Sequence, residues 1–290
     1  MSLVVPVRHR GGTPLAALLR GHSVEVLPRT ADRVADFRAM FSPGTRVHVA
    51  HIAGTPVADM VRTAARLRAE GFAPMPHLPA RVLPDRRTLC DLVAGYVDAG
   101  VRGVLVLGGS PGRPAGPFHC AMQLLETGLL DGFARVHVAG HPEGSRDIDP
   151  GGGEETAMAA LRAKAAWAAR SGTEMAIVTQ FAFDADPVIA WEGRLRAAGI
   201  ALPVHVGLAG PARLQTLIRY AVACGVGPSL QVLQRRARDV THLLRPVAPT
   251  GVAQRLAEHA AAHPGSLFRG LHLFPLGGLE ATAAWAREAG

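Results

Sequence analysis

Short runs of β-branched and other apolar residues alternate along this chain with longer runs of Ala, Leu and Arg that have helical periodicity. This alternation is typical of parallel strands joined by crossover helices. The strand-like runs are Ser23–Leu27, Arg46–Ile52, Ala73–Leu78, Gly103–Leu107, Arg135–Gly140, Met175–Phe181, Val204–Leu208 and Gly270–Phe274. The helix-like runs include Val57–Glu70, Arg86–Ala99, Glu154–Arg170, Pro187–Ala198, Pro211–Ala223, Ser229–Leu243 and Val252–His263.

The number of these repeats constrains the fold. Eight strand–helix units in a chain of 290 residues have the dimensions of a (β/α)8 TIM barrel. A doubly wound open sheet is the competing architecture, but such sheets usually have fewer strands. No Pro/Ser-rich linker and no change in composition divides the sequence. We therefore expect residues 1–290 to form a single barrel domain of the α/β class.

The sequence lacks the features of membrane and secreted proteins. No stretch approaches the roughly 18 uncharged apolar residues of a membrane span. The N-terminal apolar run is too short for a signal peptide, and its charges follow that run. Cys90, Cys120 and Cys224 are isolated, a spacing that predicts neither a disulfide framework nor a zinc ribbon. We expect a soluble, cytoplasmic protein.

The charge of the chain favours a small anionic ligand. The formal net charge is +8 and comes almost wholly from arginine, because Lys164 is the only lysine. Aromatic residues make up 5% of the chain and are not interleaved with basic clusters, so no nucleic-acid surface is predicted. A basic balance can instead attract an anionic small molecule. A homo-oligomer is left open.

Two of the predicted strands carry a polar side chain among apolar ones. Gln180 has the same parity as the small Ala176, so we expect it to point into the barrel near the ligand-binding mouth. Glu25 lies between Val24 and Val26 and is also expected to point inward. A buried carboxylate without a partner has a raised pKa, so Glu25 is predicted to hold a proton near neutral pH, as a general acid must. For both side chains, an internal hydrogen bond is the alternative interpretation.

Histidines form a second polar set in the predicted strands. Those in mid-strand positions are His48, His137, His205 and His272, and those at or near strand ends are His51, His77 and His141. Imidazoles from several barrel strands can converge on a metal, but the sequence has no HxH pair and few carboxylates near them, so no metal site is predicted. We expect the mid-strand histidines to make internal hydrogen bonds, and His77 and His141 to contact a ligand.

Glycine-rich segments follow two of the strands. Gly108-Gly109-Ser110-Pro111-Gly112 has neither the ending of a P-loop nor a GxGxxG spacing, but its glycines could let the backbone approach a cofactor closely. The helix predicted to begin at Glu154 follows three glycines, and its N-terminus could receive a phosphate.

Five segments, in chain order, resemble motifs of the methylenetetrahydrofolate reductase family. Val24-Glu25-Val26-Leu27-Pro28 is similar to the family's first strand, in which an acid is followed by proline. Pro76-His77-Leu78 matches its Pro-His-Leu, and Ala139-Gly140-His141-Pro142-Glu143-Gly144 resembles its Ala-x-Tyr-Pro-Glu. Thr179-Gln180-Phe181-Ala182-Phe183-Asp184 is close to its Thr-Gln-x-x-Phe-Asp, the most specific of the set. His272-Leu273-Phe274 stands where the family has His-Phe-Tyr on the last strand.

The resemblance extends over nearly the whole predicted barrel, and it implies an oxidoreductase. The family transfers a hydride between NADH or NADPH and 5,10-methylenetetrahydrofolate, with FAD as the carrier, and gives 5-methyltetrahydrofolate. The folate ring must open before hydride arrives, and protonation of N10 opens it. The resemblance implies this general-acid role for Glu25.

The resemblance also implies roles for other residues. Gln180 matches the glutamine that hydrogen-bonds the pterin, and Ser110 stands where the family has an aspartate that meets both pterin and flavin. His77 matches a histidine of the flavin site, and His141 replaces a tyrosine that contacts the flavin. Gly109 and Lys164 complete the expected cofactor-binding set, with Lys164 in place of a basic pair near the flavin phosphates.

Several positions depart from the family pattern. Gly108-Gly109-Ser110 replaces Arg-Gly-Asp, which implies that FAD is weakly bound or dispensable. Flavin-independent hydride transfer is therefore one alternative, and a pterin-binding one-carbon transferase without redox chemistry is another. A folate- or flavin-binding barrel without catalysis is a third, which the presence of Glu25 opposes. The direction of the reaction also stays open.

Overall fold

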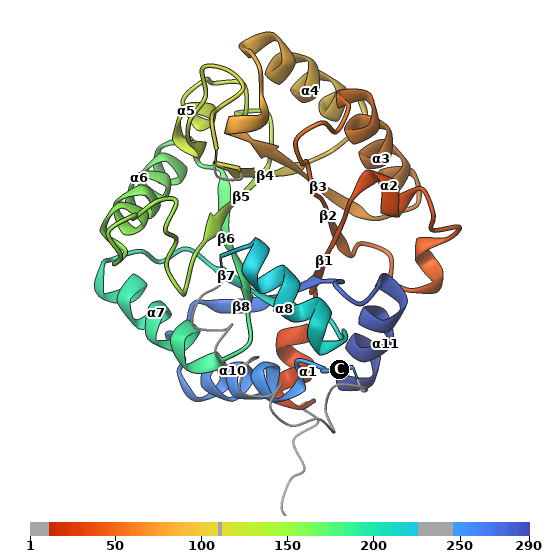
Figure 1. Ribbon diagram of the computed structural model, residues 1–290, viewed down its shortest axis with the longest axis vertical. Helices are drawn as coiled ribbons and strands as arrows, with labels where there is room; N and C mark the ends of the chain where they lie inside the picture. The colour runs from red at the N-terminus through yellow and green to blue at the C-terminus, as the bar shows by residue number, and fades with distance from the viewer. Residues whose placement is uncertain (1–11, 110–111, 226–245) are drawn as a thin grey trace, which may run out of the picture.

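Eight parallel strands close into a barrel in which each strand pairs with its neighbours in sequence order, and the last pairs with the first (Figure 1). This arrangement comes from a computed structural model that describes residues 12–109, 112–225 and 246–290. The strands are β1 (Ser23–Val26), β2 (Arg46–Val49), β3 (Ala73–Pro79), β4 (Gly103–Leu107), β5 (Arg135–Gly140), β6 (Glu174–Ala182), β7 (Val204–Ala209) and β8 (Phe268–Phe274). The predicted TIM barrel is confirmed, and the open sheet is excluded.

Helices surround the barrel and follow the strands along the chain (Figure 1). They are α1 (Pro14–Leu19), α2 (Pro28–Ala31), α3 (Val57–Ala69), α4 (Arg86–Asp98), α5 (Ala121–Leu125), α6 (Glu155–Ser171), α7 (Ala185–Ala197), α8 (Leu214–Ala223), α10 (Thr250–Ala262) and α11 (Leu279–Ala289). Two short 3-10 helices are η1 (Phe37–Ala39) and η2 (Ala80–Val82). The predicted helix Ser229–Leu243 lies outside the described residues.

Local capping and pairing explain where element ends differ from the prediction. α7 begins at Ala185, two residues earlier than expected, because the Asp184 side chain accepts a hydrogen bond from the backbone N–H of Asp186 at 3.1 Å. α8 begins at Leu214 rather than Pro211, because Ala212 forms an antiparallel bridge with Val247. The described helices include none that is long and apolar enough to span a membrane.

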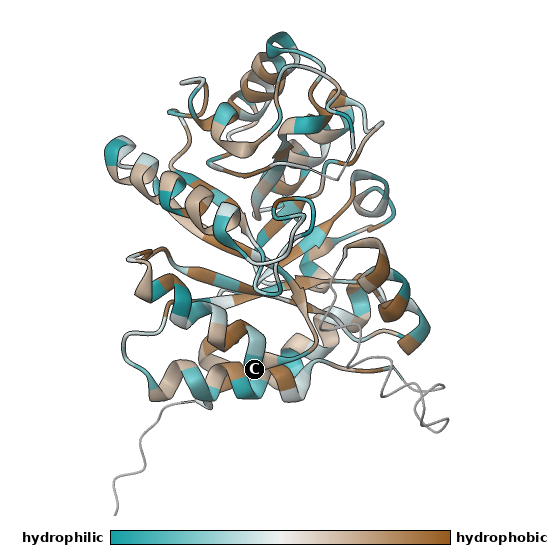
Figure 2. Cartoon of the chain, turned by 60° about the vertical axis from the view of Figure 1, so that its left-hand side comes forward, coloured by the Kyte–Doolittle hydropathy of each residue, from teal (hydrophilic) through white to brown (hydrophobic). Residues whose placement is uncertain are grey.

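The main apolar core lies between the barrel and the helices. Alternate strand residues such as Val24, Val26 and Ile177 pack there with helix residues such as Leu92 and Trp191. The helices accordingly carry both hydrophobic and hydrophilic residues (Figure 2). Because successive strand residues point to opposite faces, the residues between these valines and isoleucines face the barrel interior. The core therefore fixes which side chains enter the interior.

A second apolar cluster covers the carboxyl ends of β6, β7 and β8. It contains Phe181, Phe183, Ala209, Ala212, Leu214, Leu217 and Ala221, with Phe274 packed against it. Through this cluster α8 is held against the mouth of the barrel, where ligands of TIM barrels bind. In Figure 1, α8 lies in front of β8.

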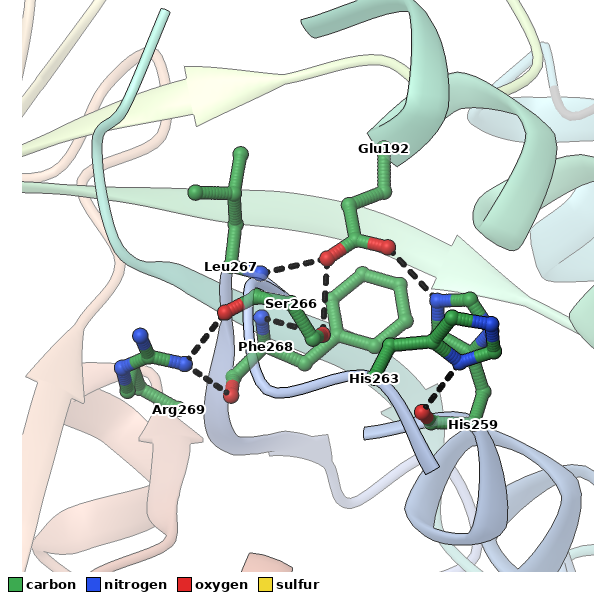
Figure 3. Close-up of polar contacts among 7 residues, drawn as sticks. All are labelled: Glu192, His259, His263, Ser266, Leu267, Phe268 and Arg269. Atoms are coloured by element: carbon green, nitrogen blue, oxygen red, sulfur yellow. Dashed lines mark hydrogen bonds and ion pairs between the residues drawn. The ribbon is translucent and has the colours of Figure 1, made fainter. Parts of the chain in front are cut away.

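A buried carboxylate joins α7 and α10 to the segment that leads into β8 (Figure 3). Glu192 is 1% exposed, and its carboxylate accepts hydrogen bonds from the hydroxyl of Ser266 at 2.7 Å and from the backbone N–H of Leu267. Nε2 of His259 donates to its other oxygen at 2.7 Å. Burial raises the pKa of Glu192, but these hydrogen bonds outweigh burial and lower the pKa below its ordinary value. The ionised carboxylate thus holds α7 and α10 to the chain that enters β8.

Substitution of Glu192 tests this role. Glu192→Ala leaves the hydroxyl of Ser266 and the N–H of Leu267 without their acceptor, so we expect the free energy of unfolding to fall by about 2–4 kcal/mol. Glu192→Gln keeps an acceptor oxygen and should lose less. Urea denaturation measures both variants against Glu288→Ala, which removes an exposed carboxylate from α11. Equal stability of Glu192→Ala and wild type would contradict this role.

Candidate active site at the barrel mouth

Glu25 and two histidines converge inside the barrel, near its mouth. The Oε2 atom of Glu25 lies 3.6 Å from Nε2 of His77 and 3.8 Å from Nε2 of His272. The three residues come from β1, β3 and β8, which the closed sheet brings together. The Glu25 side chain is 24% exposed, whereas both histidines are buried. A molecule at the mouth can therefore reach the carboxylate, which itself contacts both rings.

Ser23 orients His272. The Ser23 hydroxyl lies 2.8 Å from Nδ1 of His272, and the two residues are partners in the register between β1 and β8. If the hydroxyl donates, the ring hydrogen is on Nε2 and faces the Glu25 carboxylate, an arrangement that favours the ionised acid. The opposite tautomer would direct a lone pair at a carboxylate oxygen. The geometry thus selects the tautomer that stabilises ionised Glu25.

The charge state of Glu25 differs from the sequence prediction. Burial raises the pKa of this carboxyl, but its interactions with His272 and His77 outweigh burial and lower the pKa below the ordinary value. At 3.6 and 3.8 Å the contacts are longer than ordinary hydrogen bonds, so their effect is mainly electrostatic. The prediction of a protonated Glu25 is wrong for the ligand-free protein, because it assumed a carboxylate without partners.

His77 is uncharged at neutral pH. Burial lowers its pKa to about 4, and the positive charge that His272 and His51 carry when protonated acts in the same direction, although Glu25 opposes it. The pair therefore consists of an ionised carboxylate and a neutral imidazole. The structure places His77, which was predicted to bind cofactor, beside the predicted acid.

The side chain of Gln180 lies at an irregularity between β6 and β7. The pairing register of the two strands shifts between Val178 and Phe181. At this bulge, the amide oxygen of Gln180 accepts a hydrogen bond from the backbone N–H of Phe181 at 3.0 Å. The residue is partly exposed, so its NH₂ group can still donate to a ligand. The half-buried amide is thus partly satisfied within its own strand.

His141 and Lys164 line one small pocket beside the mouth. The pocket lies between the end of β5 and helices α6 and α7, and Ala139, Leu161 and Trp191 also line it. Burial lowers the pKa of His141 to about 4, and the charge of Lys164 adds to this effect. Burial also lowers the pKa of Lys164. The structure therefore brings together two of the predicted cofactor-binding residues.

The glycines after β4 lie beside β3. Gly109 has a φ of +96°, and a Cβ atom there would lie 3.3 Å from Cβ of Pro79, so a side chain would be strained. Ser110, predicted to bind substrate, lies outside the described residues. Gly109 thus lets the chain after β4 pass close to the end of β3.

Arg81 is a residue at the mouth that the sequence did not reveal. Its guanidinium donates to the carboxylate of Asp147 at 2.6 Å and to the carbonyl of His119 at 3.1 Å, and its backbone N–H donates to Gly108. It therefore ties together the segments that follow β3, β4 and β5. No motif signals this role, because the partners are far apart in sequence.

The N-terminus of α6 is already occupied. The carboxylate of Asp149 accepts hydrogen bonds from the backbone N–H groups of Thr156 at 2.9 Å and Ala157 at 3.1 Å. An acidic side chain thus already accepts from two of the N–H groups that a phosphate at this end of the helix would use, which favours a plain connection over a phosphate site.

The mid-strand histidines only partly follow the prediction. His272 makes the expected internal hydrogen bond, to Ser23. Neither ring nitrogen of His48 or of His137 has a hydrogen-bond partner in the described ranges, so the prediction is wrong for these two. Their neighbours in the interior are other histidine rings and apolar side chains, which explains the missing partners.

Comparison with known proteins identifies no family for this chain. No protein family model matches the chain. Solved structures that resemble it include deoxyribose phosphate aldolase from Aeropyrum pernix, with 13% identity, a TM-score of 0.43 and coverage of 93% of this chain and 97% of that chain. They also include 2,3-dimethylmalate lyase, with 11% identity, a TM-score of 0.47 and coverage of 96% and 86%.

A further similar structure is an uncharacterised protein from Clostridium thermocellum that binds two copies of 5-methyl-5,6,7,8-tetrahydrofolic acid. It has 9% identity and a TM-score of 0.47, over 93% of this chain and 96% of that chain. At these levels of identity the likeness concerns the arrangement of strands and helices, and it carries no conclusion about function.

The proton state of Glu25 can be measured directly. In the ligand-free protein, side-chain carbon NMR should find the pKa of Glu25 below 4.5, its ordinary value. Because the folded-state pKa is lowered, the ionised group contributes stability above that pH, and this contribution is lost as the pH falls through the folded-state pKa. The spectrum of Glu25→Gln identifies the signal. A Glu25 carboxyl that still carries a proton at neutral pH would contradict the site described above.

Proposed function

We propose that this protein is an oxidoreductase that interconverts 5,10-methylenetetrahydrofolate and 5-methyltetrahydrofolate by hydride transfer from or to NADH or NADPH. One observation carries the proposal: Glu25, His77 and His272 lie in three separate motifs that resemble the methylenetetrahydrofolate reductase family, and they contact one another at the mouth. Their proximity supports the proposal because residues that act on one bound molecule must lie together in the folded chain, although mutual stabilisation would also bring them together.

Glu25 is the proposed acid and base. In reduction, Glu25 gives its proton to N10, the bond between N10 and the methylene carbon breaks, and hydride adds to the resulting iminium carbon. In oxidation the same carboxylate takes the proton from N10 as the ring closes. The ionised carboxylate of Glu25 suits the oxidation of 5-methyltetrahydrofolate, in which it accepts the proton. For reduction, a folate that covers the mouth would exclude water from the carboxylate, and this desolvation would raise its pKa toward the value that an acid requires.

Gln180 is the proposed pterin ligand. Because the N–H of Phe181 holds its amide oxygen, the orientation of the amide is fixed and the NH₂ group is left to donate. A ring nitrogen or carbonyl oxygen of a pterin can accept such a bond. Phe274, which is partly exposed and whose ring centroid lies 5.4 Å from that of the buried Phe181, offers an apolar surface at the same end of the barrel.

Two of the residues present, Lys164 and His141, could pair with the phosphates of a flavin, although the pocket that they line is too small to enclose one. Lys164 and His141 line one pocket, where Lys164 supplies a positive charge, and Gly109 keeps the backbone beside Pro79, at the end of β3, free of a side chain. We propose that these residues and His77 hold FAD. FAD, when bound, accepts hydride from the nicotinamide and gives it to a carbon acceptor. Flavin-independent transfer is the variant that the missing arginine and aspartate after β4 favour.

Glu25→Gln tests the assigned chemistry. The amide keeps the size of the side chain but removes the transferable proton, so we expect folate turnover to fall by at least ~10²-fold. Oxidation of the nicotinamide by an artificial acceptor should continue, because it needs no acid at N10. Steady-state assays of the two half-reactions on one preparation make this comparison. Near-normal folate turnover by a folded Glu25→Gln protein would contradict the mechanism.

A one-carbon transferase is the second candidate function. The replacement of Arg-Gly-Asp by Gly108-Gly109-Ser110 favours it, because it removes the acid that meets the flavin in the reductases. A transferase would act on methylated folate without consuming a nicotinamide. Absorbance of the nicotinamide during turnover distinguishes the two functions.

A further inference from the structure

The barrel interior contains a cluster of five buried histidines, here called the histidine core: His48, His77, His137, His205 and His272. They come from β2, β3, β5, β7 and β8, and none is more than 6% exposed. Ring centroids are 4.5 Å apart for His48 and His272, 5.5 Å for His48 and His137, and 5.3 Å for His137 and His205. His48 is also 5.7 Å from His77. The core is therefore continuous from Glu25 into the barrel.

Many ring nitrogens of the histidine core make no hydrogen bond, although Nε2 of His77 and Nε2 of His272 lie near the Glu25 carboxylate. Within the described residues, the buried nitrogens without a hydrogen bond are Nδ1 and Nε2 of His48 and of His137, Nε2 of His77 and of His272, and Nδ1 of His205. Such an interior is costly even for neutral rings, since each unpaired polar atom loses its hydration. A charged ring there would cost more, because it would lie in a low-dielectric interior beside other imidazoles.

Charged groups lie at both ends of the histidine core. At the mouth these are Glu25, the titratable His51 in the segment after β2, and the thiol of Cys224 at the end of α8, which interacts with Glu25. At the opposite end, Arg46 and Arg135 begin β2 and β5, and Glu174, which begins β6, pairs with Arg135 at 2.7 Å. The strand β4 has no titratable residue, and the other interior positions of β6 beside the core are Ala176 and Val178. Of the two arginines, Arg135 is paired with Glu174, whereas Arg46 forms no ion pair with a carboxylate among the described residues. The positive charge of Arg46 therefore acts on the rings from the end of the barrel opposite the mouth.

Burial and the positive charges around the core oppose its protonation, whereas the negative charge of Glu25 favours protonation of His77. Burial lowers the pKa of His48 and His137 well below the ordinary value, and the positive charge of neighbouring histidines and of Arg46 adds to the effect. Burial lowers the pKa of His77 to about 4 and that of His205 to about 3. The unfolded chain, whose histidines titrate near 6.5, therefore binds more protons than the folded protein at mildly acidic pH. The free energy of unfolding must therefore fall as the pH decreases below about 6.5, the pKa of the histidines in the unfolded chain.

We propose that the histidine core is an acid-sensitive switch: the barrel stays closed while the core is neutral, and joint protonation of the core opens the barrel and dismantles the site around Glu25. The core and the site share His77 and His272, so one event removes both. This inference does not depend on the proposed reaction. The described residues include no group of three side chains placed to hold a metal ion, so the rings are not assigned to a metal centre.

The pH dependence of unfolding tests the switch in the wild-type protein. His48, His77, His137 and His205, which are neutral in the folded state and titrate normally when unfolded, together raise the unfolding equilibrium constant on the order of 10³-fold between about pH 6 and about pH 5. His141, outside the core, adds to this change because its pKa is also lowered to about 4. Urea denaturation monitored by circular dichroism at several pH values gives the ratio of the unfolding equilibrium constants at about pH 5 and about pH 6. A change of about tenfold or less would overturn the proposal, since it corresponds to one histidine at most.

Variants locate the effect. His48→Phe and His137→Phe each remove one titrating ring but keep an aromatic side chain, so each should reduce the ratio about five- to tenfold. Met75→Leu, at the position paired with His48 in β3, is the control that changes the interior without removing a titrating group. Phe variants that retain the wild-type ratio would overturn the proposal. If a Phe variant does not fold, His48→Gln and NMR titration of the wild-type imidazoles decide: rings that protonate above pH ~6 in the folded protein would also overturn it.

Discussion

Closure of the sheet is the constraint on which the rest of this structure depends. A closed parallel barrel has one face of every strand inside, where side chains can meet only side chains of other strands. Polar residues in this space must therefore find partners across the barrel, and here they are mostly imidazoles. One carboxylate near the mouth, Glu25, meets two of these rings. The proton state of the site thus follows from the composition of the interior.

The same constraint explains why Glu25 differs from an isolated buried acid. Desolvation alone would raise its pKa, but His77 and His272 lie close enough to stabilise the negative charge. Ser23 fixes the orientation of one ring from the neighbouring strand position. The site can then change its proton affinity when a ligand covers the mouth, because solvent still reaches a quarter of the carboxylate side chain. A carboxyl whose pKa rises only when a ligand occupies the mouth suits a reaction in which the acid gives its proton to the bound ligand and stays ionised when water fills the site.

The sequence was sufficient for the fold, because the alternation of strand and helix patterns depends on local residues. The parity of Val24 and Val26 was also sufficient to place Glu25 inside. The pKa of Glu25 could not be predicted, because its partners come from other strands. The partner of Gln180 depends on a register shift that no local pattern reveals. Arg81 and Glu192 escaped notice for the same reason: each joins segments that only the folded chain brings together.

The fate of the transferred hydrogen tests the central claim most directly. The protein would be incubated with 5,10-methylenetetrahydrofolate and NADH or NADPH deuterated at C4 of the reduced nicotinamide ring, and in parallel with the unlabelled reduced cofactor in heavy water. Mass spectrometry of the folate product then locates the label. The account predicts 5-methyltetrahydrofolate with deuterium in its methyl group, from the nicotinamide if transfer is direct or from water if an exchanging carrier intervenes. Complete absence of methylated product, with the folded protein and an added flavin present, would contradict it.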